Sequence, residues 1–170
     1  MSSLTLSPTL SPKLYVPARN NTPNASQTMT ASHDPRPHNG GLEKAIHERR
    51  NHDRAIRVIF LDIDGVLNNV RQKDAMSIDN NCLKLFAELV IRTSSYIVMS
   101  STWRKHPAFM DFLLIKFRAL NIEDRLIGKT SVIGDFERVA EISTWIRRFE
   151  TKYSFPLDGW VAIDDMHLDA

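Results

Sequence analysis

Residues 56–68 read IRVIFLDIDGVLN, a short run of β-branched and apolar residues that ends in two aspartates and a glycine. Such a run predicts a strand that is buried on both faces. Asp62 and Asp64 are two positions apart, so both side chains would point to the same face if the strand stayed regular. Gly65 permits an abrupt chain reversal that leaves Asp64 free to swing over Asp62. We therefore expect a strand whose carboxyl end carries a pair of carboxylates.

Strand and helix patterns alternate from this segment to the end of the sequence. The predicted strands lie within residues 56–63, 95–99, 126–133 and 160–163. The predicted helices are an apolar-faced segment at 78–92 that includes Leu85 and Leu89, a second at 107–120, and a third capped by Asp135. Strands that alternate with helices form parallel β/α units. We predict an α/β fold, a three-layer sandwich with a central parallel sheet, over residues 55–170.

Residues 1–42 have a different composition from the rest of the chain. They contain six of the eight prolines and are rich in Ser, Thr and Asn. A segment of this kind cannot bury enough apolar surface to offset its ordering entropy, so we expect it to be disordered. Residues 43–54 are strongly charged, and we expect either a short helix or a solvated lead-in to the folded domain.

Composition excludes several classes of protein. The length of 170 residues suits one domain, and the net charge of +2 gives no argument for a nucleic-acid or membrane surface. Cys82 is the single cysteine, which excludes an intramolecular disulfide framework and a cysteine-rich zinc site. No apolar run suits a membrane span or the core of a secretory signal. We therefore expect a cytoplasmic protein without a membrane partner.

Three predicted strands end in polar clusters. These clusters are Asp62 with Asp64, Ser100 with Ser101, and Asp164 with Asp165. The carboxyl ends of parallel strands meet at one edge of a sheet, where open α/β sheets bind their ligands. Paired carboxylates repel each other unless a cation or a shared proton compensates, and oxygen ligands near a phosphate favour Mg²⁺.

The first of these clusters resembles a motif of the haloacid dehalogenase (HAD) superfamily of aspartate-based phosphohydrolases. That motif is an apolar strand followed by Asp-x-Asp-Gly, and residues 62–68, DIDGVLN, match it. Residues 96–100, YIVMS, are similar to the second motif, and residues 161–165, VAIDD, are similar to the fourth. Over residues 56–167 the resemblance implies a HAD-like Rossmannoid fold.

A narrower resemblance concerns the branch related to Swiss army knife RNA-repair proteins. Residues 100–104, SSTWR, look like that branch, as does the pattern Arg-x-x-Glu-Ile-x-x-Trp at residues 138–145. Ser101, Thr102 and Arg104 are secondary site candidates by this resemblance, whereas Trp103 is more simply explained as packing.

The resemblance implies a phosphatase mechanism. Asp62 is the nucleophile that forms an aspartyl-phosphate, Asp64 is the general acid and base, and Ser100 donates a hydrogen bond to a phosphoryl oxygen. Mg²⁺ is bound by Asp62, by the backbone carbonyl of Asp64, and by one or both of Asp164 and Asp165.

The cation of the third motif has two candidates in the sequence. Arg138 lies in the helix pattern quoted above, and Lys129 lies at the end of the third predicted strand. Either could neutralise charge on a transferring phosphoryl group. A cation at a helix start is mildly unfavourable with the helix dipole, which favours a functional reason for Arg138.

The spacing of the motifs bears on the substrate. Asp64 to Ser100 spans 36 positions and Ser100 to Arg138 spans 38, so neither gap holds a cap domain. An open site favours a large or terminal phosphate, such as a polynucleotide end or a phosphoprotein, although it also suits a promiscuous small-phosphate enzyme. The alternative function is a non-catalytic HAD-like binding or regulatory module.

The sequence stops five residues after Asp165, earlier than in most HAD domains. We therefore expect a C-terminally shortened sheet. The edge of its last strand would be open to pairing with another chain, which is a route to oligomers.

Overall fold

The computed structural model of the chain describes residues 13–15, 40–52, 55–68, 76–134 and 137–168. Its strands are β1 (Lys13–Tyr15), β2 (Arg57–Leu61), β3 (Tyr96–Met99), β4 (Leu126–Lys129) and β5 (Gly159–Asp164). Its helices are α1 (Gly40–His52), α2 (Asn80–Thr93), α3 (Pro107–Arg118) and α4 (Arg138–Tyr153), with short 3₁₀ helices η1 (Thr102–Lys105) and η2 (Glu123–Arg125). None of the described helices combines the length and the apolar character that crossing a membrane requires.

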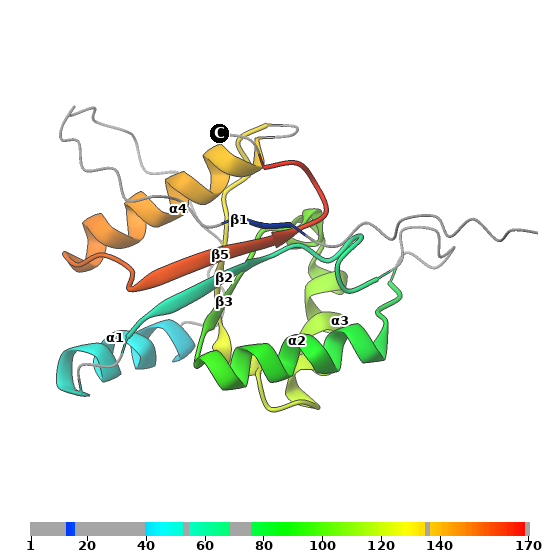
Figure 1. The fold of residues 1–170 in the computed structure, drawn as a ribbon, viewed down its shortest axis with the longest axis horizontal. Helices are drawn as coiled ribbons and strands as arrows, with labels where there is room; N and C mark the ends of the chain where they lie inside the picture. The colour runs from blue at the N-terminus through cyan, green and yellow to red at the C-terminus, as the bar shows by residue number, and fades with distance from the viewer. Residues whose placement is uncertain (1–12, 16–39, 53–54, 69–75, 135–136, 169–170) are drawn as a thin grey trace, which may run out of the picture.

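The strands form one sheet in the order β1-β5-β2-β3-β4. β2 lies between β5 and β3 and is parallel to both, and β3 is parallel to β4. In Figure 1, α4 lies on one side of this sheet, and α2 and α3 lie on the other. The predicted three-layer α/β sandwich with a central parallel sheet is therefore confirmed.

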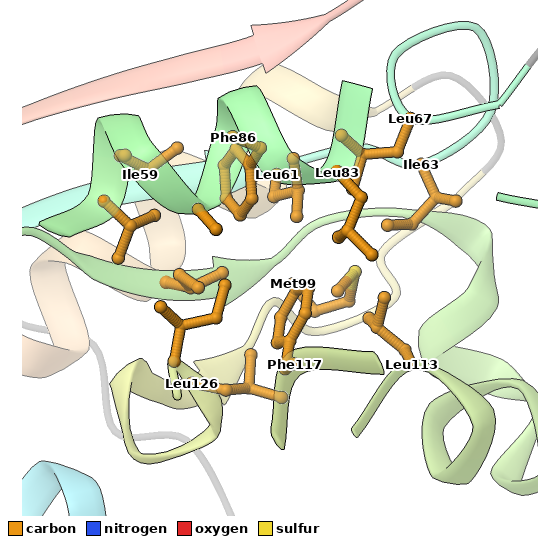
Figure 2. Close-up of a cluster of buried hydrophobic side chains, with 14 of the residues drawn as sticks. Ile59, Leu61, Ile63, Leu67, Leu83, Phe86, Met99, Leu113, Phe117 and Leu126 are labelled. Atoms are coloured by element: carbon orange, nitrogen blue, oxygen red, sulfur yellow. The ribbon is translucent and has the colours of Figure 1, made fainter. Parts of the chain in front are cut away.

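Alternate residues of β2 supply the two halves of the core. Ile59 and Leu61 face α2 and α3, and Figure 2 shows them close to Phe86 and Phe117 of these helices. Val58 and Phe60 belong to the cluster on the opposite face, which α1 and α4 cover. Burial on both faces explains why residues 58–61 of β2 are continuously apolar rather than alternating.

Helix α2 shows how the sequence sets the ends of an element. The Asp79 side chain accepts hydrogen bonds from the backbone N–H groups of Asn81 and Cys82, which caps the amino end. Ser94 adopts a left-handed conformation with φ of 53° and ends the helix. The predicted apolar face is partly wrong, because Leu85 and Leu89 are 67% and 39% exposed. The buried side chains are instead Leu83, Phe86, Ala87 and Val90.

The structure of the N-terminal segment differs from two expectations, one about its disorder and one about the open edge of the last strand. Lys13–Tyr15 forms β1, and α1 begins at Gly40, so the expectation of disorder over residues 1–42 is wrong for these residues. β1 runs antiparallel to β5, with Lys13 opposite Asp164. The edge of the last strand is therefore paired by this chain rather than open. Residues 1–12 and 16–39, and the proposed cap Asp135, lie outside the described residues.

Of the two states expected for residues 43–54, the structure has the helical one over residues 43–52, which belong to α1, and residues 53–54 lie outside the described residues. Ala45 and Ile46 of α1 are buried against the β-sheet core, which explains why so charged a segment is held in place. Arg49 also forms an ion pair with Asp158, with a distance of 2.6 Å between Nη1 and Oδ2.

We predict that deletion of residues 1–39 lowers the free energy of unfolding by about 2 kcal/mol, because the backbone hydrogen bonds of β1 to β5 are lost at roughly 1 kcal/mol each. Urea unfolding measures this change. The matched control is deletion of residues 1–12, which keeps β1 and should leave the unfolding midpoint unchanged. Equal stability of the two truncated proteins would contradict a stabilising role for β1.

Candidate functional site

Register places three polar residues side by side at the carboxyl edge of the sheet. Leu61 of β2 is paired with Met99 of β3 and with Ile163 of β5. The next residue of each chain segment is Asp62, Ser100 or Asp164, respectively. Backbone hydrogen bonds continue the pairing, from Asp62 N to the Ile163 carbonyl at 3.0 Å and from Ser100 N to the Leu61 carbonyl at 2.9 Å. The predicted convergence of the three clusters is therefore found in the structure.

Arg138, the first residue of α4, reaches into this edge. Its Nη1 atom lies 3.4 Å from Asp62 Oδ1, 3.1 Å from Ser100 Oγ and 3.2 Å from Asp164 Oδ2. The Arg138 side chain is 8% exposed, so these contacts are made away from bulk water. One guanidinium nitrogen thus contacts two carboxylates and a hydroxyl from three different strand ends.

Lys129, the other candidate for this cation, points elsewhere. Its Nζ atom lies 3.5 Å from the backbone carbonyl oxygen of Arg104, and no contact with Asp62 or Asp164 is found among the described residues. Of the two cations that the sequence left open, the structure brings Arg138 into the cluster and leaves Lys129 outside it.

The Asp-Gly turn after β2 allows a close approach of the β5 end. Gly65 has φ of +78°, a conformation that favours glycine. A Cβ atom at this position would lie 2.1 Å from Asp165 Oδ2. The bare backbone of Gly65 therefore makes room for the Asp165 carboxylate.

Asp64 is fixed by two neighbours on one of its oxygens. Its Oδ1 accepts a hydrogen bond from Asn68 Nδ2 at 2.8 Å and one from Trp103 Nε1 at 3.2 Å. Asn68 Oδ1 in turn accepts from the backbone N–H of Gly65 at 3.0 Å. Trp103 is buried, as a packing residue would be, but it also orients Asp64, a role that could not be predicted from the residue pattern.

Three carboxylates of the site could hold a metal ion. Asp62, Asp164 and Asp165 each offer one oxygen, and these oxygens lie within 4.8 Å of one another. Asp164 Oδ1 accepts a hydrogen bond from the backbone N–H of Met166 at 2.9 Å. Its Oδ2 is buried and has no hydrogen bond to any described residue, although Arg138 lies nearby. This donor set consists of the hard oxygen ligands that Mg²⁺ prefers.

Burial changes the acidity of the two inner carboxylates. The pKa of Asp62 is raised from 3.8 to about 6, chiefly by burial and also by the charge of Asp164, while Arg138 and a hydrogen bond from Ser101 oppose the rise. Burial also raises the pKa of Asp164, again against the effect of Arg138. A single arginine therefore does not fully compensate two buried carboxylates.

A second pair of charges lies behind the site. Arg104 Nη2 and Glu141 Oε2 are 2.6 Å apart, and both side chains are 4% exposed. Arg104 Nη1 also donates to the backbone carbonyls of Ser100 and Ser101, at 2.6 Å each. Glu141 Oε2 lies 3.9 Å from Arg138 Nε, so one carboxylate faces both arginines. This pair positions the Ser100 segment and Arg138 together.

Glu141 was part of the quoted helix pattern but was not identified as a site residue. The available signal was a carboxylate three positions after Arg138, next to the apolar Ile142, on the face of α4 that turns inward. Of the secondary candidates, Arg104 and Ser101 are buried in the site, whereas Thr102 is exposed at its rim.

The raised pKa of Asp62 predicts a pH-dependent stability in EDTA. Because the folded pKa of about 6 exceeds the ordinary 3.8, the protonated folded form is favoured. The resulting stabilisation is full below pH 4 and is lost as the pH rises through 6. A shift of this size is worth about 3 kcal/mol. Urea unfolding should show that the free energy of unfolding of the wild type falls by about 3 kcal/mol between pH 4 and pH 8, relative to that of Asp62→Asn. Identical pH profiles of the two proteins would contradict a raised pKa of Asp62.

Comparison with known proteins agrees with this geometry. The sequence model of the family described as HAD domain in Swiss Army Knife RNA repair proteins matches residues 58–170, which include the three strand ends and Arg138. Comparisons with curated proteins and with solved structures gave no match. Since the match covers well over half of the chain and its span contains the whole site, the chain belongs to the family of HAD domains found in Swiss Army Knife RNA repair proteins.

Proposed function

We propose that the protein is a Mg²⁺-dependent phosphohydrolase that acts through an aspartyl-phosphate on Asp62. The observation that carries this proposal is the position of Arg138 Nη1, within 3.4 Å of Asp62, 3.1 Å of Ser100 and 3.2 Å of Asp164. A carboxylate nucleophile, a hydroxyl donor and a cation are thereby adjacent. Phosphoryl transfer depends on such positioning and charge stabilisation.

The residues at the sheet edge fit a magnesium ion. Asp62, Asp164 and Asp165, with the backbone carbonyl of Asp64, would hold it. Asp164 Oδ2 is buried and has no hydrogen bond to a described residue beside its ion pair with Arg138, and bare Gly65 lets the Asp165 carboxylate approach, and both features support a cation there. When bound, Mg²⁺ neutralises the carboxylates and the phosphoryl oxygens and so favours attack by one anion on another.

The proposed chemistry assigns a separate task to each side chain. The Asp62 carboxylate attacks phosphorus, and the bond from phosphorus to the leaving oxygen breaks. Asp64 gives its proton to that oxygen and later removes a proton from the water that hydrolyses the acyl phosphate, which restores Asp62. Ser100 and Arg138 bind phosphoryl oxygens.

The position of Asp64 supports its role as acid and base. Its Oδ1 is held by Asn68 and Trp103, and it is half-buried at the mouth of the turn. With one oxygen fixed, the other can be directed at the leaving group without a search through rotamers. Orientation of this kind is a principal source of rate in proton transfer.

We further propose a large or terminal phosphate as the substrate. Between Asp64 and Arg138 the described residues form only core elements, namely α2, β3, η1, α3, η2 and β4, and none builds a cap over the site. A phosphate at a chain end can enter such a site without a lid. The family name refers to RNA repair, which favours a polynucleotide end over a phosphoprotein.

We predict that Asp62→Asn lowers the rate of Mg²⁺-dependent hydrolysis of an aryl phosphate at least about 1,000-fold, because the nucleophile is lost. Ser100→Ala should lower it only about tenfold, since one hydrogen bond to the phosphoryl group is lost. The matched control is Asp111→Asn, which removes an exposed carboxylate of α3 and should leave the rate unchanged. An active Asp62→Asn protein would exclude this residue as nucleophile. A folded wild type that hydrolyses neither aryl phosphates nor phosphorylated oligonucleotide ends would favour the non-catalytic module.

We also predict that Mg²⁺ raises the melting temperature of the wild type measured in EDTA-treated buffer, because binding to the folded state adds stability by mass action. Asp164→Asn should abolish this rise, since it removes the buried ligand oxygen. Glu123→Gln, which alters a carboxylate of η2 away from the site, is the control and should keep the full rise. A rise retained in Asp164→Asn would contradict the proposed ligand set.

A further inference from the structure

A second cavity, of about 390 Å³, lies between the end of β4, the outer half of α4 and the start of α1. Its lining combines three cationic with three aromatic side chains: Lys129, Arg148, Lys152, Trp145, Phe149 and Tyr153. No aspartate or glutamate belongs to the described lining. The cavity has the size of a small-ligand site, and its positively charged lining favours a negatively charged ligand.

The cations of this cavity are held where a ligand can reach them. Arg148 Nη1 donates to Ser131 Oγ at 2.8 Å, and this contact fixes the guanidinium at the rim. Arg148 and Lys152 are exposed, and Lys129 is half-buried. Lys129 lies outside the cluster around Asp62 and lines this cavity instead, where it can contact a different ligand.

Thr130 provides a buried hydroxyl in the wall of the cavity that has no partner in the described part of the chain. It lines the cavity, is 3% exposed, and its Oγ1 atom has no hydrogen-bond partner among the described residues. A buried hydroxyl without a partner costs free energy, so such groups are usually satisfied by water or by a ligand.

The aromatic wall adds a surface for stacking. Trp145 and Phe149 stack with ring centroids 5.4 Å apart, and Trp145 packs nearly perpendicular to Phe60 of the core, with an angle of 82° between the rings. Trp145 is half-buried, so part of its indole is open to the cavity that it lines. Aromatic faces beside cations bind nucleobases and their phosphates.

We propose that this cavity binds a nucleotide unit, with its base against Trp145 and its phosphate between Arg148 and Lys129. The ligand is either a free nucleotide or one unit of a single strand, because both present the same base and phosphate. The proposal concerns binding alone and does not depend on hydrolysis at Asp62.

The cavity shares one loop with the catalytic site. The backbone carbonyls of Thr130 and Ser131 accept hydrogen bonds from Arg104, at 3.2 and 3.4 Å. The backbone N–H of Ile133 donates to Glu141 Oε1 at 3.2 Å. A nucleotide in the cavity therefore contacts the segment that also supports the Arg104–Glu141 pair behind the site.

Fluorescence anisotropy of a labelled oligouridylate with hydroxyl ends tests the proposal, because this probe offers no terminal phosphate to the catalytic site. In the full chain, Arg148→Gln should weaken binding about tenfold through loss of a charge-assisted contact. Arg147→Gln, an exposed neighbour that does not line the cavity, should change binding less than twofold. Absence of binding in the wild type, or equal weakening by the two variants, would overturn the proposal.

Two further arms complete the experiment. Adenosine 3′,5′-cyclic monophosphate, a free nucleotide without a phosphomonoester, should compete with the probe if a single unit suffices; failure to compete while the Arg148 effect persists assigns the cavity to a strand. Thr130→Val should weaken binding without lowering the melting temperature, because its hydroxyl has no partner to lose within the described protein. Unchanged binding in Thr130→Val would refute its contact with the ligand.

Discussion

Two carboxylates that are buried side by side are the constraint on which the structure at this end of the molecule depends. Asp62 and Asp164 follow adjacent parallel strands and are 5% and 1% exposed. Carboxylates so placed cannot both remain ionised without a counter-charge, and burial, together with the charge of Asp164, raises the pKa of Asp62 by more than Arg138 lowers it. Arg138 supplies the counter-charge from the first turn of α4, despite the unfavourable helix dipole there. A further cation would balance the negative charge of the two carboxylates that Arg138 leaves uncompensated.

Arg138 in turn depends on residues that never reach the site surface. Glu141 faces both Arg138 and Arg104, and Arg104 binds the carbonyls that follow β3 and β4. Truncation of any member of such a buried set leaves an uncompensated charge behind. The carboxyl edge of the sheet is thus supported at once by α4, by η1 and by the loop after β4.

Much of this arrangement followed from local sequence. The β2 segment predicts both a buried strand and an Asp-x-Asp-Gly turn. Parallel pairing of the strands is then enough to predict that Asp62, Ser100 and Asp164 lie together. The choice between Arg138 and Lys129 could not be made in this way, because it depends on the direction in which two side chains leave different elements. β1 was missed because three residues carry no periodicity, and their order comes from the edge of β5. The predicted buried face of α2 differs from the observed one because apolar residues such as Leu85 occur on several sides of the helix. Tertiary packing therefore decides which of them are buried.

β5 is the last described strand in the sequence, yet it lies inside the sheet between β1 and β2. During synthesis, β2, β3 and β4 are available to pair long before β5 is made, and until then β2 has an unpaired edge. Both Asp164 and Asp165 are made only with this strand, so a nascent chain that lacks it has Asp62 and Ser100 but not these two carboxylates. Assembly of the site therefore requires the last described strand, and non-local strand pairing of this kind is in general slow and exposes a chain to aggregation. With the proposed ligand set, affinity for a metal ion would therefore depend on whether β5 is in place.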